Sequence, residues 1–239
     1  MQLTRAQRDR IVHDTVAELT GGWGVPAART VRKRVSAQLR SAGAADVLAI
    51  GAGIAASPAM KTRRARWVGW ELINKHPRAL AQLDLRTVES LGAGNSSWDE
   101  VDGYAIYVSG AAWLRGRIRD IDVRRWTRSE DLWRRRAALV STVVLNTKTH
   151  GGSGDAKRTL DIAQRLVDDR EDMVVKAMSW ALRALAPWDK RAVESFLSAH
   201  ETRLAARVKR ETRTKLRTGK KNGRPAQQRG RTGGQTPGV

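Results

Sequence analysis

The segment SSWDEVD, residues 96–102, places a tryptophan and a carboxylate where a helix would hold them together. Ser97 followed three residues later by Glu100 is the pattern of a capping box, which predicts that a helix begins here. On such a helix Trp98 and Asp102 lie four residues apart on one face. Because the next residues of that face are largely apolar, the sequence predicts a carboxylate on a face that should otherwise be buried.

Two further helical patterns bring charged and aromatic side chains to apolar faces. In SEDLWRRRAALVSTVVL, at about 100° per residue, Arg136 falls inside the apolar face while its two neighbouring arginines point away. In EDMVVKAMSWALRAL the apolar stripe contains Trp180, with Lys176 and Arg183 along its edge. Taken singly, a buried Asp and a buried Arg most often pair with each other, and a Trp at helical spacing is most often core. The combination on three helices is what suggests a site.

Other motifs carry less weight. The glycines of IGAGIAAS, residues 50–57, have dinucleotide-fingerprint spacing, but that fingerprint works between a strand and a helix, and no such unit is predicted. Small residues that allow close helix packing are the better interpretation. There is no P-loop, and the four histidines lack the i, i+4 spacing of a helical zinc site. With no cysteine there is no thiolate chemistry. We predict neither a metal nor a cofactor.

The charge balance makes nucleic acid the leading class of partner. The 239 residues include 45 Lys/Arg and 24 Asp/Glu, a net charge of +21. Residues 203–239 contain 12 of the basic residues and one acid, yet the rest of the chain is also basic. An anionic membrane surface is the second class of partner. The remaining interpretation is that the excess charge only aids solubility. Without a long apolar run or a signal-peptide pattern, we expect a cytoplasmic, nucleoid-associated protein with no membrane partner.

Helical periodicity dominates and predicts an all-α fold. Thr4 and Gln7 form a capping-box pattern for a first helix that reaches about Leu19. No segment alternates convincingly as a strand does. Antiparallel helix pairs favour a bundle or a HEAT-like α-solenoid domain over residues 1–217, and residues 218–239 should form a disordered basic tail. Further amphipathic runs lie at about 28–40, 59–75, 84–91, 97–115, 130–146, 156–168, 171–186 and 188–216.

SSWDEVD, EDLWRRRAALVS and VVKAMSWALRAL, in this order and spacing, resemble the AlkD-like DNA alkylation repair glycosylases. The resemblance covers about residues 30–200 and implies a HEAT-like α-solenoid with a concave basic groove for duplex DNA that contains alkylated bases. It implies that Asp102 is the catalytic carboxylate, flanked by Trp98 and Trp180. Arg136 would contact a phosphate, and we expect Lys176 and Arg183 to bind DNA as well. We expect a monomer.

The resemblance also implies the reaction, which is excision of positively charged alkylated purines, such as 3-methyladenine and 7-methylguanine, in base excision repair. A cationic base is already a good leaving group, so a strong general acid is not needed. A fixed carboxylate would stabilise the oxocarbenium-like sugar and orient a water. Tryptophan faces would attract the cationic lesion, at ~0.5–2 kcal/mol each. The resemblance implies capture of the lesion along the groove, without a tight base pocket. Asp99, off the inward face, should matter much less than Asp102.

Two alternatives stay open at this stage. The first is a non-catalytic solenoid that binds distorted or branched DNA. The second is a protein-binding scaffold in which the Asp–Arg pair is purely structural. An open basic groove on which Asp102, Trp98, Trp180 and Arg136 converge would favour the enzyme. A fully buried Asp102 would favour the scaffold.

Overall fold

The structure is a computed structural model, and it describes residues 2–21, 24–62 and 64–221. Every regular element in these ranges is helical, so the predicted all-α, solenoid-like fold is confirmed. No helix in them has both the length and the apolar character needed to cross a membrane. The elements are α1 (Arg5–Gly21), α2 (Val25–Gln38), α3 (Ala44–Ala56), α4 (Pro58–Thr62), α5 (Trp67–Lys75), α6 (Pro77–Ala81), α7 (Leu85–Leu91), α8 (Trp98–Tyr104), the π-helical turn η1 (Ala105–Ser109), α9 (Gly110–Leu114), α10 (Asp120–Trp126), α11 (Leu132–Leu145), the 3-10 turn η2 (Lys148–His150), α12 (Ala156–Arg165), α13 (Asp172–Leu185), α14 (Lys190–Ala199) and α15 (Ala206–Thr218).

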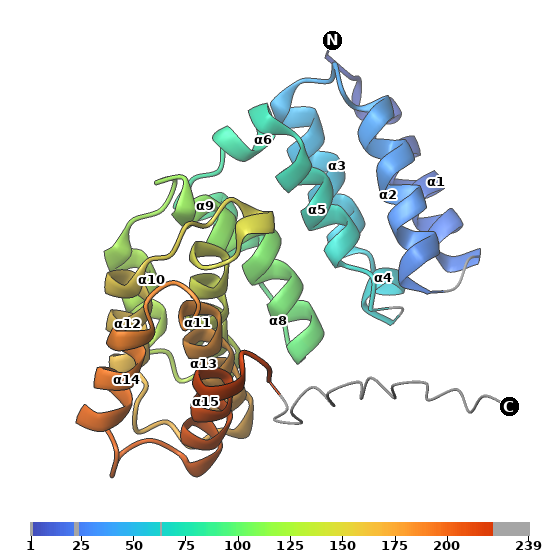
Figure 1. The fold of residues 1–239 in the computed structure, drawn as a ribbon. Coiled ribbons are helices and arrows are strands. Elements are labelled where there is room, and N and C mark those ends of the chain that lie inside the picture. The colour runs from blue at the N-terminus through green and yellow to red at the C-terminus, as the bar shows by residue number, and fades with distance from the viewer. Residues whose placement is uncertain (1, 22–23, 63, 222–239) are drawn as a thin grey trace, which may run out of the picture.

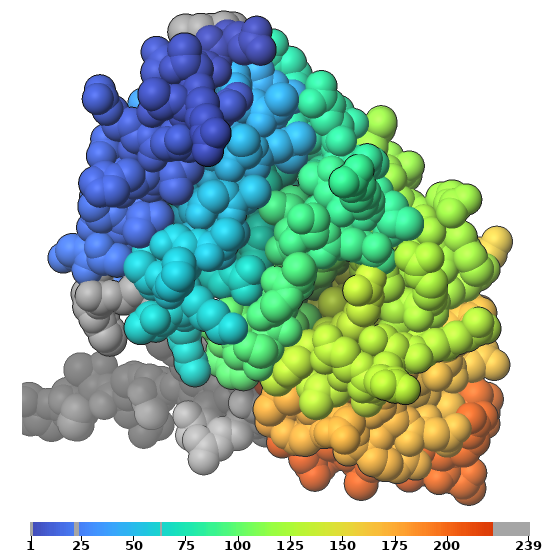
Figure 2. Space-filling model, turned by 180° about the vertical axis from the view of Figure 1, so that it is seen from behind, coloured from blue at the N-terminus to red at the C-terminus, as the bar shows by residue number. Residues whose placement is uncertain are grey.

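The helices follow one another along a curved path, from α1 and α2 at the upper right of Figure 1 to α14 and α15 at the lower left. One continuous row packs α1 on α3, α3 on α5, α5 on η1, η1 on α11, α11 on α13 and α13 on α15. The opposite face shows the same progression in chain order (Figure 2). The helices that carry the predicted site also lie together, because α8 runs into η1 and packs on α11, which packs on α13. The fold thus brings distant sequence segments together.

Most of the predicted helices are present, with several changes at their ends. The Thr4–Gln7 capping box forms in both directions: the Gln7 side chain accepts from the Thr4 N–H (2.8 Å), and Thr4 Oγ1 accepts from the Gln7 N–H (3.2 Å). The run expected at 59–75 is two helices, α4 and α5, and that at 188–216 is α14 and α15. Three helices were not predicted, namely α3, α6 and α10. Of the predicted tail, residues 222–239 lie outside the described residues.

The glycines of residues 50–57 serve close helix packing, as the sequence indicated. They lie on α3, which packs along α5. A Cβ built on Gly51 would lie 2.7 Å from the Gly69 carbonyl oxygen, and one built on Gly69 would lie 2.2 Å from the Gly51 carbonyl oxygen. Side chains at either position would separate the two backbones. The segment is therefore a helix-packing motif in the N-terminal half of the row.

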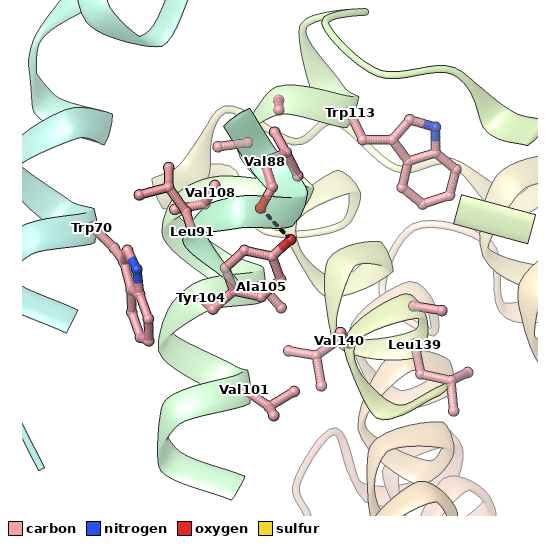
Figure 3. Close-up of a cluster of buried hydrophobic side chains, with 14 of the residues drawn as sticks. Trp70, Val88, Leu91, Val101, Tyr104, Ala105, Val108, Trp113, Leu139 and Val140 are labelled. Atoms are coloured by element: carbon pink, nitrogen blue, oxygen red, sulfur yellow. Dashed lines mark hydrogen bonds between the residues drawn. The ribbon is translucent and has the colours of Figure 1, made fainter. Parts of the chain in front are cut away.

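The apolar core supports the inner helices on which the site is built (Figure 3). Val101 and Tyr104 of α8 lie buried against Val140 of α11 on one side. On the other side the ring of Trp70 from α5 meets Tyr104 edge-on, with centroids 6.0 Å apart. The Tyr104 hydroxyl donates to the Val88 carbonyl at 2.9 Å, which satisfies the one polar atom of that side chain in the core. This packing fixes α8 between its two neighbours.

Candidate active site

Asp102 of α8 and Arg136 of α11 form a bidentate ion pair. Arg136 Nε donates to Asp102 Oδ1 and Arg136 Nη2 donates to Asp102 Oδ2, both at 2.9 Å. The third nitrogen, Nη1, donates to the Met173 carbonyl of α13. The Arg136 side chain is 6% exposed and that of Asp102 is 16% exposed. The inward placement predicted for both residues is confirmed, and the carboxylate keeps a solvent-facing edge.

Trp98 stands one turn before Asp102 and is the most exposed tryptophan among the described residues, at 48%. It opens α8, as the sequence predicted, with Ser97 as the N-cap residue. The expected capping box is wrong in its bonds, because the Ser97 side chain makes no cap hydrogen bond. Glu100 instead accepts from the Ser96 N–H (2.8 Å) and from Arg66 Nη1 (3.2 Å).

The ion pair between Glu100 and Arg66 links the N-terminal helices to α8, and the sequence did not reveal it. Arg66 is buried, its Nε donates to the Ala55 carbonyl (2.7 Å), and its guanidinium lies 5.0 Å from the Trp70 ring centroid. Arg66 Nη1 also donates to Asn95 Oδ1 at 2.7 Å. These contacts fix the start of α8 and hence the direction of Trp98 and Asp102. Because Arg66 and Glu100 are 34 residues apart, no local sequence pattern could have predicted their contact.

The π-helical turn η1 follows α8 directly and changes the helical phase after Asp102. A π turn adds a residue to the helix, and such turns often occur at functional sites. Asn74 Nδ2 donates to the Tyr107 carbonyl at 2.9 Å, which ties the turn to α5. Ser109 and Trp113, which a uniform helix would place on the same face as Asp102, are fully buried here. The face predicted to be buried therefore stays buried beyond the π turn.

The remaining predicted residues lie on α13, the helix whose Met173 carbonyl holds Arg136. Trp180 is seven residues further along, on the same face, and is partly buried against the core. Lys176 is held by Asp172 at 2.6 Å. Arg183 is 12% exposed and lies 3.7 Å from Glu211 of α15. Each of these two cations already faces a carboxylate, and burial lowers the pKa of the Arg183 guanidinium.

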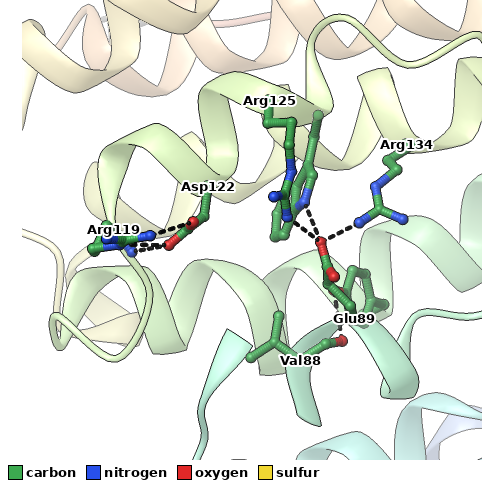
Figure 4. A network of polar contacts seen from close by, with 8 residues as sticks. Val88, Glu89, Arg119, Asp122, Arg125 and Arg134 are labelled. Carbon is green, nitrogen blue, oxygen red and sulfur yellow. Dashed lines mark hydrogen bonds and ion pairs between the residues drawn. The ribbon is translucent and has the colours of Figure 1, made fainter. Parts of the chain in front are cut away.

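The arginines that flank Arg136 belong to a different surface. Arg134 joins Arg125 and the Trp126 indole around Glu89 of α7, as Figure 4 shows. Arg135 donates to Asp169 at 2.7 Å. The prediction that only Arg136 of the three adjacent arginines faces inward is therefore confirmed.

Burial raises the pKa of the Asp102 carboxyl above its ordinary value. The hydrogen bond and positive charge of Arg136 oppose that rise, and the negative charge of Asp99 adds to it. Asp99 is only 16% exposed, its Oδ1 has no hydrogen-bond partner, and Arg64 Nε is 3.9 Å from its Oδ2. Because its charge reaches the site, Asp99 bears on Asp102 more directly than the sequence suggested.

The chemistry of this arrangement can be compared with known families. Residues 13–216 match the sequence model of a family described as DNA alkylation repair enzyme. The chain belongs to this family. No curated protein and no solved structure matched.

As a DNA alkylation repair enzyme, the protein has DNA as its substrate. In the candidate site both oxygens of the Asp102 carboxylate accept hydrogen bonds from Arg136, and the carboxylate is partly shielded from water. The exposed Trp98 stands one helical turn before it. Such a carboxylate can stabilise positive charge that develops near it. Among the described residues, no three His, Asp or Glu side chains form a cluster that could hold a metal ion.

Proposed function

We propose that this repair enzyme is a DNA N-glycosylase that excises positively charged alkylated purines, such as 3-methyladenine and 7-methylguanine, from duplex DNA. The observation that carries the proposal is the fixed Asp102 carboxylate, which keeps a solvent-facing edge beside the exposed Trp98. The family supports a role in alkylation repair, and the residues support this particular reaction.

In the proposed reaction, the bond between C1′ of the sugar and the alkylated purine breaks, and the base leaves with the bonding electrons as a neutral molecule. Positive charge moves onto the sugar, where the Asp102 carboxylate stabilises it. A water then forms the new bond to C1′ and gives its proton to solvent. The product is an abasic site, and the leaving base needs no proton because its charge already makes it a good leaving group.

Arg136 takes the role of a positioning residue in this proposal. Three of its N–H groups are used on Asp102 and Met173, which fix the direction of the carboxylate oxygens. The phosphate contact expected for Arg136 stays a prediction, as do the DNA contacts of Lys176 and Arg183. Trp98 and Trp180 would offer aromatic faces to the cationic lesion and the sugar.

The experiment that tests this function measures release of free base. Purified protein is incubated with duplex DNA that contains a single N7-methylguanine, and free base and abasic sites are quantified over hours. We expect both products to accumulate together above the spontaneous rate. If the protein binds this DNA and no base is released, the runner-up function is correct, namely a non-catalytic DNA-binding protein in which the Asp102–Arg136 pair is structural.

We expect the release rate to depend on pH through Asp102. The ionised carboxylate is the active form and burial raises its pKa, so the rate should fall with decreasing pH at values above those of an ordinary Asp. Asp99→Asn removes one cause of the raised pKa, so its acidic limb should move to lower pH. Single-turnover rates from acidic to neutral pH, corrected for spontaneous depurination, measure the acidic limb of the wild type and that of the variant. An unmoved limb in Asp99→Asn would contradict the assignment to Asp102.

A further inference from the structure

A basic pocket lies on the N-terminal helices, away from Asp102. It is a cavity of about 310 Å³ between the second half of α2 and the end of α5, with Val47 of α3 and Pro77 of α6 also lining it. Four cationic side chains line it, and none of its lining residues is acidic. We call this cavity the basic pocket, and its cations are Arg32, Lys33, Arg40 and Lys75.

Three of these cations have no carboxylate partner. Lys33, Arg40 and Lys75 are exposed, and in the described ranges no ion pair joins any of them to an acid. The contrast with the residues predicted to bind DNA is clear, because Arg136, Lys176 and Arg183 each face a carboxylate. The pocket therefore offers cations without acidic partners, whereas those predicted DNA-binding residues of α11 and α13 are paired.

Arg32, on the wall of the pocket, has an unsatisfied donor. Its side chain is 12% exposed and lies 3.4 Å from Glu71, but the geometry gives its Nε no hydrogen bond. Its Nη1 donates to Ser36 Oγ, another lining residue, at 3.3 Å. Because this buried Nε faces Glu71, Arg32 is a wall of the pocket, and the exposed Lys33, Arg40 and Lys75 are the cations open to a ligand.

The basic pocket is connected to the helix that carries Asp102. The helix α5, whose end lines the pocket, packs against both α2 and η1, and η1 continues α8. Tyr107 of η1 lies 6.5 Å from the Trp67 ring and 6.3 Å from the His150 ring, centroid to centroid. Burial lowers the pKa of His150, and the nearby charge of Lys75 lowers it further. Trp67 and Lys75 both belong to α5, so this helix joins the pocket to the aromatic side chains beside η1.

We propose that the basic pocket binds a phosphodiester group of duplex DNA and so holds the DNA backbone on the N-terminal side of the lesion. The proposal rests on duplex DNA being the substrate in the proposed function, and it does not depend on base excision. Three exposed cations without acidic partners around a small cavity fit a singly charged phosphodiester.

Affinity for undamaged duplex, measured over a range of salt concentrations, tests the proposal. The triple variant Lys33→Gln/Arg40→Gln/Lys75→Gln should bind more weakly, with the slope of log K against log[salt] smaller by about one for each phosphate that the variant no longer binds. The control is Arg86→Gln/Lys157→Gln/Arg191→Gln, which removes the same charge from exposed positions on α7, α12 and α14. Its slope should stay close to that of the wild type. Equal slope changes in the two triples would overturn the proposal.

Amine acylation, read by mass spectrometry, locates the bound phosphate and identifies its source. Undamaged duplex should protect Lys33 and Lys75 while Lys157 stays reactive. Inorganic phosphate at equal ionic strength should not protect them. Protection by inorganic phosphate as strong as that by duplex would overturn the proposal in favour of a free-anion site. Because neither measurement involves base release, an inactive protein with a protected pocket would contradict the proposed function alone.

Discussion

Replacing Asp102 by Asn should lower the rate of base release from N7-methylguanine duplex by roughly 100-fold or more, which corresponds to about 3 kcal/mol of barrier. The decrease is expected because a neutral amide cannot stabilise the positive charge that develops on the sugar. Affinity for DNA should change little, since Asn has nearly the same shape and can still accept one hydrogen bond from Arg136. Single-turnover kinetics with enzyme in excess, together with a binding titration, separate the two effects.

A matched control is available on a neighbouring ion pair. Asp169 is paired with Arg135 at 2.7 Å and, at 9% exposed, is at least as buried as Asp102. Asp169→Asn removes the same charge from a carboxylate outside the candidate site, so its release rate should remain that of the wild type. If Asp102→Asn releases base as fast as the wild type, Asp102 is not the catalytic carboxylate and the bidentate pair is only structural.

The sequence predicted the inward face of α8 and of α11 because both faces lie within the first turns after a clear helix start. Ser97 marks the residue before α8, and counting from there puts Trp98 and Asp102 together. Arg136 could be distinguished from its two neighbours because helical periodicity places only one of three adjacent residues on a given face. These inferences needed no knowledge of the tertiary structure.

Other features depend on contacts between distant segments, and periodicity could not provide them. A π turn breaks the 3.6-residue period that a helical wheel assumes, and nothing in the sequence pattern indicated that α8 continues into one. Glu100 matched a local capping pattern, but its partner Arg66 lies 34 residues away. The helix α3 is apolar on nearly all sides and contains glycines that pack on α5, so it lacks the amphipathic pattern that reveals a surface helix.

The sequence also could not show which charged side chains are free to bind DNA. The net charge of +21 predicted a nucleic-acid partner, but it could not show which cations are already neutralised. Lys176 and Arg183 border the predicted face, yet each forms an ion pair, Lys176 with Asp172 and Arg183 with Glu211. Lys33 and Lys75 belong to helices that are separated in sequence, and only the packing of α2 on α5 brings them to one cavity.

The second large effect concerns the stability of the Asp102–Arg136 pair. Arg136→Met should lower the free energy of unfolding by about 3–5 kcal/mol, because it leaves a largely buried carboxylate without its partner. Asp102→Leu/Arg136→Met removes both charges and should recover most of that stability, since well-packed apolar residues often replace a buried pair without cost. Urea unfolding of the wild type, the single variant and the double variant measures the recovery.

Activity then distinguishes a catalytic carboxylate from a structural one. If Asp102 acts on the sugar, the double variant should be stable, bind DNA and release no base above the spontaneous rate. Arg135→Met is the control for the single variant. It changes the neighbouring arginine of α11 and breaks the ion pair of that arginine with Asp169. It should be less stable yet keep its release rate when assayed at a temperature where it is folded. A stable double variant with wild-type release would show that the site works without any carboxylate at position 102, and the proposed mechanism would be wrong.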